Sequence, residues 1–127
     1  MSKIVRYCTL ATLVALALPI TARADHGRIS SADDLHVLFA GATGSGTSSR
    51  GSAYVVKFSA DGSATVKSGS NFSDRGKWTI ESGTYCAQWT KVRGGKKGCF
   101  EVSHKAGTKY HLKAIDGAED ADVEIVK

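Results

Sequence analysis

The 127-residue sequence lacks the short motifs on which much enzyme and metal chemistry depends. It has no G-x-S-x-G segment for a nucleophilic serine, and no H-E-x-x-H or C-x-x-C spacing for a metal ion. No lysine occupies the expected position of its one glycine-rich, P-loop-like stretch, residues 41–48. The sequence offers no candidate catalytic residue, which favours a non-enzymatic protein with no metal and no cofactor.

Long apolar runs and prolines are also scarce. The one extended apolar run covers residues 7–18 and is followed by Pro19, the single proline. Lys3 and Arg6 precede the run, and residues 22–24 (Ala-Arg-Ala) place small side chains at −3 and −1 of a cleavage point. This pattern predicts a signal peptide that is cleaved near Ala24.

Cleavage there would give a mature chain of residues 25–127 in the periplasm or secreted medium. The apolar run is too short for a permanent membrane-spanning helix, so we do not expect an integral membrane protein. The 103 residues that remain are enough for one β domain and too few for two.

Acidic residues are absent from the predicted signal peptide, which alters the charge balance. Removing its three bases leaves 14 basic and 12 acidic residues, so the net charge falls from +5 to +2. A chain so close to neutral makes a general nucleic-acid partner a poor expectation.

Only three cysteines are present, and Cys8 lies within the predicted signal peptide. Cys86 and Cys99 remain as a pair in an oxidising compartment, which predicts a disulfide; the alternative is two buried free thiols. The bond would close a loop of about 14 residues, worth roughly 3 kcal/mol in the chain-entropy model.

The first periodic segment after the signal is helical. Ser31 is a suitable N-cap, and Leu35, Leu38 and Phe39 form an apolar stripe before Gly41. This predicts a short helix over about residues 31–40. The Gly, Ser and Thr residues of 41–53 predict a flexible loop or a poorly paired edge.

Beyond residue 53, apolar and polar residues alternate with a period of two. Glycine-containing turns separate about seven short runs, and the connections are too short for crossover helices. Residues 69–75 read as a polar loop. The predicted fold is mainly β: an antiparallel meander that forms a small barrel or half-barrel, with one short N-terminal helix and one disulfide.

The alternation also assigns side chains to faces. Trp78, Trp89 and Phe100 fall on the predicted inner face and are candidate ligand-binding residues, whereas Cys86 and Cys99 have the opposite parity. A two-residue hairpin at residues 94–95 would leave the two sulfurs about 13 Å apart along the strand, beyond bridging range. We favour the disulfide and hence a wider loop over residues 90–98.

Charge is unevenly distributed along the second half of the chain. Residues 91–113 hold seven bases and one acid, and residues 116–124 hold five acids and no base. We expect an exposed partner-binding loop for an unknown protein or an anionic envelope component, with a solvated sheet face as the alternative. The candidate residues in that loop are Lys91, Arg93, Lys96 and Lys97.

Two histidines flank a turn at residues 106–107. His104 and His111 lie on adjacent predicted strands, so a shared metal or haem contact is one reading and ordinary surface histidines the other. The sequence alone assigns them no role.

Several motifs together carry a family resemblance. They are Leu35-x-x-Leu38-x-x-Gly41-x-Thr43, Phe58-x-x-Asp61-Gly62, Gly76-x-Trp78, Tyr85-Cys86-x-x-Trp89, Cys99-Phe100 and Tyr110. In this order they resemble a family of small secreted proteobacterial proteins known as domain of unknown function 995, over about residues 31–117. The resemblance implies an exported, disulfide-linked β domain and carries over no activity. The Gly76-x-Trp78 triplet is also similar to the one that opens the first strand of lipocalin-like barrels, although here it lies in mid-chain.

Two functional classes follow from these patterns. The first is an exported, non-enzymatic β domain that binds an envelope component, a small apolar ligand or a partner protein. The alternative is an inhibitor of a secreted lysozyme or protease that acts through the loop at residues 90–98.

Overall fold

The computed structural model describes residues 27–127, so the predicted signal peptide at residues 1–24 lies outside the described residues. The described part contains nine strands, one α-helix and one 3-10 helix. In chain order they are β1 (Arg28–Ile29), α1 (Ala32–Phe39), β2 (Thr43–Thr47), β3 (Ala53–Phe58), β4 (Ser63–Ser68), β5 (Phe72–Glu81), β6 (Thr84–Trp89), η1 (Val92–Gly95), β7 (Gly98–Ala106), β8 (Lys109–Ala114) and β9 (Ala121–Val126). Within residues 27–127, no helix is both long and apolar enough to cross a membrane.

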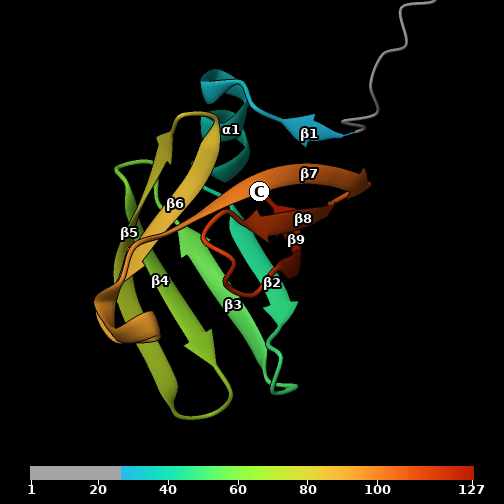
Figure 1. The fold of residues 1–127 in the computed structure, drawn as a ribbon. Coiled ribbons are helices and arrows are strands. Elements are labelled where there is room, and N and C mark those ends of the chain that lie inside the picture. Colours follow the sequence, from blue (N-terminus) through green and yellow to red (C-terminus); the bar gives the residue numbers. More distant parts are fainter. Residues whose placement is uncertain (1–26) are drawn as a thin grey trace, which may run out of the picture.

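Strands β2 to β9 form a closed barrel of eight antiparallel strands (Figure 1). Each strand pairs with the next along the chain, and β9 pairs back onto β2 through residues 43–46 and 123–126. The predicted antiparallel meander is therefore confirmed, and it closes completely instead of stopping as a half-barrel. Because the sheet closes, each of these eight strands has a neighbouring strand on both sides.

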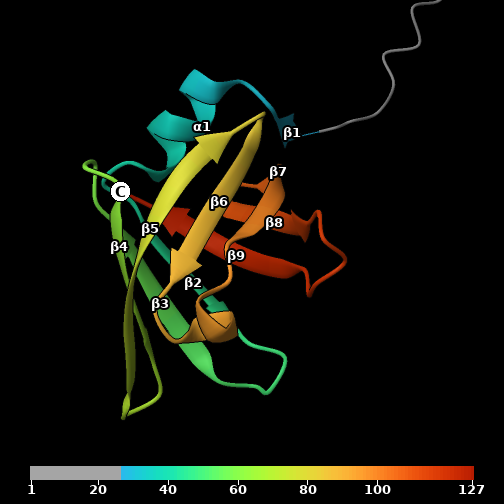
Figure 2. The same cartoon turned by 60° about the vertical axis from the view of Figure 1, so that its left-hand side comes forward.

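Helix α1 covers one end of the barrel (Figures 1 and 2). Its N-cap is Ser31, whose Oγ accepts a hydrogen bond from the backbone N–H of Asp34 at 3.4 Å. The apolar stripe places Leu35 and Phe39 completely out of solvent, and the Phe39 ring stacks on Tyr85 at 4.3 Å between centroids. The predicted helix is confirmed, and this packing supplies the partner surface that so short a helix requires.

Strand β1 completes the sheet where β6 and β7 separate. Only residues 98–100 of β7 pair with β6, and the two residues of β1 pair instead with Val102 and Ser103. The fully buried Val102 side chain lies in this part of β7. The N-terminal segment therefore covers a stretch of strand edge that would otherwise be exposed.

The loop expected at residues 41–53 is wrong for residues 43–47, which form the strand β2 that closes the barrel. A Cβ atom on Gly44 would lie 3.2 Å from the Phe58 ring, and one on Gly46 would lie 2.6 Å from the Tyr54 hydroxyl. The two glycines give the large side chains of β3 room over the β2 backbone. From composition alone, a segment of Gly, Ser and Thr is predicted to be a loop.

The polar loop expected at residues 69–75 is also shorter than predicted, because β5 begins at Phe72. Asp74 lies within this strand and is 95 % buried, being only 5 % exposed. Aspartate usually occurs in exposed loops, so the sequence does not predict a buried carboxylate in a strand.

The predicted disulfide between Cys86 and Cys99 is confirmed. The two residues are direct cross-strand partners in β6 and β7, with their Cα atoms 4.0 Å apart. The connection at residues 90–97 is accordingly wide and holds η1, and no tight Gly-Gly hairpin forms. The sulfurs lie on the outer face of the sheet, because the neighbouring Tyr85, Ala87 and Phe100 point inward.

Candidate ligand-binding cavity

The barrel encloses a cavity of about 610 Å³. All eight barrel strands contribute inward-facing residues to its wall, and most of these are aliphatic or aromatic. The floor is aromatic: Phe58 meets Phe39 and Tyr85 edge to face, with centroids 5.1 and 5.6 Å apart. The interior therefore combines an apolar wall with unfilled space.

The strand directions define which end of the cavity is accessible. Helix α1 and the turns at residues 59–62 and 82–83 lie at one end. The turns at residues 48–52 and 69–71 and the loops at residues 90–97 and 115–120 lie at the opposite end, which we call the mouth (Figure 1). Ser48, Arg50 and Arg93 from this end line the cavity, so it extends to the mouth.

The three aromatic residues predicted to contact a ligand divide into two groups. Trp89 and Phe100 line the cavity, whereas Trp78 is 3 % exposed and lies outside its lining, near α1. The indole Nε1 of Trp78 donates to the carbonyl of Ser59 at 2.8 Å, and its ring lies 5.4 Å from that of His36. Trp78 therefore joins the helix to the barrel floor.

The position of Trp89 depends on the glycine opposite it. Gly76 and Trp89 are cross-strand partners in β5 and β6, and a Cβ on Gly76 would lie 2.8 Å from the indole ring. The Gln88 carbonyl would be closer still. The Gly76-x-Trp78 and Cys86-x-x-Trp89 motifs thus describe one hairpin, in which glycine makes room for the cavity-lining tryptophan.

Two tyrosines add polar atoms to the wall without adding charge. Burial raises the pKa of Tyr85 far above its usual value. Burial also raises the pKa of Tyr54, and the negative charges of Asp122 and Glu119 raise it further. Both phenols therefore remain protonated at neutral pH, and neither adds a charge to the cavity wall.

Three of the four predicted partner-binding bases in the 90–97 loop bind groups of the barrel itself. Lys91 Nζ donates to the Ser73 carbonyl at 3.3 Å. Arg93 Nη2 donates to Asp116 Oδ2 at 2.7 Å, and Lys97 Nζ donates to Glu81 Oε1 at 2.6 Å. All four side chains are exposed, as the sequence predicts. These internal contacts reduce what the loop offers to a separate anionic partner.

Asp74 anchors the start of this loop, a role that sequence reasoning missed. Its Oδ2 accepts hydrogen bonds from the backbone N–H groups of Lys91 at 2.8 Å and Val92 at 2.9 Å, and Oδ1 accepts one from Arg75 at 2.8 Å. Burial opposes ionisation, but these three donors outweigh it and hold the pKa of Asp74 below its ordinary value. The carboxylate thus fixes the loop at the mouth.

The two histidines that flank the β7–β8 turn do not share a ligand site. His104 is the cross-strand partner of Tyr110 and His111 that of Ser103, so the two imidazoles lie on opposite faces of the sheet. His104 Nε2 lies 2.9 Å from the Gly107 carbonyl, and His111 Nδ1 lies 2.8 Å from Asp122 Oδ1. Each ring has a local structural partner.

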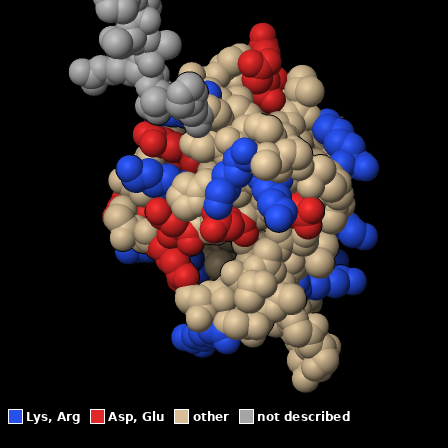
Figure 3. All heavy atoms as spheres, turned by 90° about the vertical axis from the view of Figure 1, so that its right-hand side faces the viewer, with Lys and Arg blue, Asp and Glu red and all other residues tan. Residues whose placement is uncertain are grey.

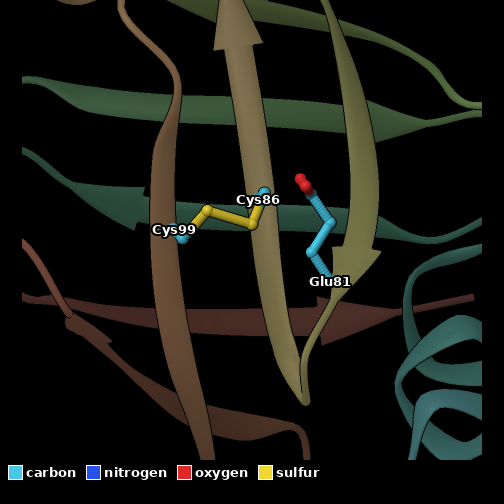
Figure 4. Close-up of side chains that lie close together, drawn as sticks. All are labelled: Glu81, Cys86 and Cys99. Carbon is cyan, nitrogen blue, oxygen red and sulfur yellow. A yellow bond between two sulfur atoms is a disulfide. The ribbon is translucent and has the colours of Figure 1, made fainter.

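Within residues 27–127, one cluster of three potential metal ligands occurs, formed by Glu81, Cys86 and Cys99 (Figure 4). The two sulfurs are bonded to each other, so neither is a free thiolate. The donor set does not fit a metal ion.

The outer surface carries charge in separate regions. Exposed bases on the outer faces of β3, β4 and β5, with one from the adjoining loop, form a set that we call the basic face: Lys57, Lys67, Arg75, Lys77 and Lys91. Four of them line an open groove of about 550 Å³. Four acids from residues 119–124, together with Lys105 and Lys109, line a second open groove beside β2 and β9. On the face drawn in Figure 3, acidic side chains gather beside a hollow, with basic ones next to them.

Comparisons with known proteins give no relative. No family model matches the chain, and neither a curated protein nor a solved structure matches it. The functional argument therefore depends on the geometry of this barrel and its cavity.

Proposed function

We propose that this protein is an exported, non-enzymatic binding protein that holds one small, mainly apolar ligand inside its barrel. The observation that carries the proposal is the cavity of about 610 Å³ with its aliphatic and aromatic wall. Small-molecule sites are concave, mostly apolar and about 300–1,000 Å³ in volume. An eight-stranded barrel is the size that either fills with side chains or holds one small ligand.

The energetics favour a ligand of this kind. Each methylene group transferred from water into the cavity contributes about 0.8 kcal/mol, so a chain of several carbons supplies enough free energy for specific binding. The disulfide between β6 and β7 and the Asp74 anchor hold one part of the wall in place before binding. Such preorganisation reduces the entropy lost when the ligand binds.

Export is part of the proposal and is supported by the sequence of residues 1–24. A disulfide in a small domain is typical of oxidising compartments outside the cytoplasm. We expect the protein purified from its native host to begin at Asp25, as determined by intact mass and N-terminal sequencing.

Filling the cavity tests the binding proposal. Val66 of β4 points into the cavity, and the adjacent Thr65 points outward and is exposed. We expect Val66→Phe to weaken binding of the apolar dye Nile red about tenfold or more, since displacing two methylene groups removes about 1.6 kcal/mol. Thr65→Phe adds the same ring outside the barrel and should leave binding unchanged.

The measurement is a fluorescence titration, with circular dichroism to establish that both variants fold. Equal binding by Val66→Phe, Thr65→Phe and the unaltered protein would place the dye outside the cavity. Absence of binding by the unaltered protein would contradict the proposal itself.

Binding of an anionic envelope component is a second candidate, favoured by one observation. The described residues that form the basic face include five exposed bases, and no ion pair joins any of them to an acid within residues 27–127. An uncompensated basic surface attracts polyanions and anionic membranes. This surface, more than the loop at residues 90–97, suits such a partner.

Hydrolase inhibition through the 90–98 loop stays a prediction. The loop is held at both ends, by Asp74 and by the disulfide, as an inhibitory loop needs to be. Its Arg93 and Lys97 side chains, however, are bonded to Asp116 and Glu81 of the barrel. These contacts favour the cavity over the loop as the binding site.

A further inference from the structure

The cavity wall is apolar in its depth and carries positive charge at the mouth. Its lining includes two charged residues, Arg50 and Arg93, and no acidic residue. Both arginines come from connections at the mouth: Arg50 from the turn between β2 and β3, and Arg93 from η1 between β6 and β7. The site is therefore apolar in its depth and cationic at its entrance.

The two guanidinium groups differ in what they already bind. Arg50 is exposed and forms no ion pair with any acid of residues 27–127. Arg93 pairs with Asp116 of the loop between β8 and β9 at 2.7 Å. Its Nη1 also lies directly against the backbone of Gly98, where a Cβ atom would clash. Gly98 is thus the residue that lets the Arg93 side chain lie along the cavity wall.

We propose that the ligand is a single-chain amphiphile with a carboxylate head group, whose tail fills the cavity and whose head binds Arg50 and Arg93 at the mouth. This inference rests on the proposed function. A guanidinium matches a carboxylate with two parallel hydrogen bonds, and such charge-assisted bonds are about twice as strong as neutral ones. Apart from Arg50 and Arg93, the lining holds no charged residue, so the depth of the cavity offers the head group no ion pair.

Asp116 already binds one amino group of Arg93, since its Oδ2 accepts a hydrogen bond from Nη2 at 2.7 Å. A carboxylate ligand therefore competes with a carboxylate of the protein, and binding exchanges one ion pair for another. Removing the charge of Asp116 should strengthen binding, because it frees Arg93. Misfolding exposes apolar surface and would strengthen binding of dodecanol as well, so a gain confined to dodecanoate is an outcome that misfolding does not produce.

Three amphiphiles with the same tail separate the head group from the chain: dodecanoate, dodecanol and dodecylamine. Trp89 lines the cavity and Trp78 does not, so a Trp78→Phe background leaves one indole as a fluorescent reporter of the site. We expect dodecanoate to bind about tenfold more tightly than dodecanol, and dodecylamine most weakly. Isothermal titration calorimetry on the unaltered protein gives the same ranking without the substitution.

Substitutions at the mouth then test which residues cause the preference for dodecanoate over dodecanol. Arg50→Gln and Arg93→Gln should each remove most of the tenfold preference for dodecanoate and leave dodecanol binding unchanged. Asp116→Asn should raise the affinity for dodecanoate alone. Lys113→Gln removes an exposed base that lies outside both the cavity and the basic face, so it is the control and should change nothing.

The outcomes separate the two proposals. Equal binding of dodecanoate and dodecanol, or an equal loss in the Lys113→Gln control, would overturn the head-group assignment and leave the cavity proposal standing. Binding of none of the three amphiphiles would overturn both.

Discussion

At the scale of single residues, the carboxylate of Asp74 fixes the start of the loop at residues 90–97 to β5. It is buried in β5 yet accepts three backbone N–H groups, two of them from the loop at residues 90–97. An asparagine has nearly the same shape but places an NH₂ group where one carboxylate oxygen stood. If the NH₂ group faced Lys91 and Val92, the backbone N–H groups of these two residues would point at another donor. They would then have no hydrogen-bond acceptor.

We expect Asp74→Asn to lower the melting temperature by several degrees at pH 7. The pKa of Asp74 is lower in the folded protein than its ordinary value of 3.8, so its stabilisation is full above that value and is lost as the pH falls through the folded pKa. The difference between the two proteins should therefore shrink below about pH 4. Melting curves from pH 7 to pH 2 measure this, with Glu119→Gln as an exposed control. A difference that stayed constant with pH would show that the charge of Asp74 is not the cause.

At the scale of elements, the hairpin of β5 and β6 connects the sequence motifs to the cavity. Trp78 fixes the helix to the floor, Trp89 lines the mouth end of the wall, and Gly76 makes room for Trp89. The disulfide then joins the same hairpin to β7. A fault in this hairpin should thus affect both stability and the binding site.

We expect Gly76→Ala to reduce the free energy of unfolding by about 1–3 kcal/mol, the usual range for overpacking a filled site. The added methyl group meets the Gln88 carbonyl and the Trp89 indole, so the emission of Trp89 should change as well. Denaturant unfolding and fluorescence spectra measure the two effects. Lys77→Ala, at the neighbouring exposed position, is the control and should change neither the free energy of unfolding nor the Trp89 emission. If Gly76→Ala were as stable as the unaltered protein, strands β5 and β6 could move apart at this point without strain.

Sequence reasoning predicted the elements that have strong periodicity and missed those whose role depends on a distant partner. The helix, the meander and the disulfide register follow from local spacing and from parity. Strand β2 did not, because Gly44 and Gly46 are favourable only beneath the rings of Phe58 and Tyr54. The cavity residues Trp89 and Phe100 could be assigned to the inside from alternation. That Trp78 lies outside the cavity lining depends on where the helix packs, which no local pattern encodes.

At the scale of the whole molecule, the charges differ between two neighbouring grooves of the barrel surface. The basic face lies on β3 to β5, and the groove beside β2 and β9 is lined by four acids and two lysines. The net charge predicted for residues 25–127 is only +2, so the local distribution of charge determines which surface approaches an anionic partner.

We expect the protein to bind vesicles of phosphatidylglycerol and not vesicles of phosphatidylcholine, with an affinity that falls as salt is added. Replacing Lys57, Lys67 and Arg75 together by Gln should weaken this binding by about two orders of magnitude, at about 1 kcal/mol for each base. Vesicle co-sedimentation measures it. The control replaces Lys105, Lys109 and Lys113 by Gln; if that variant lost as much binding, net charge and not the basic face would be responsible.

Strand β2 has a consequence for solubility. It pairs with β3 on one side and β9 on the other, yet two of its five residues have no side chain to hold it there. Were it to detach, the backbone donors and acceptors of both neighbours would be left open to strands from other molecules. We therefore expect this barrel's resistance to fibril formation to depend on a strand in which two of five residues are glycine.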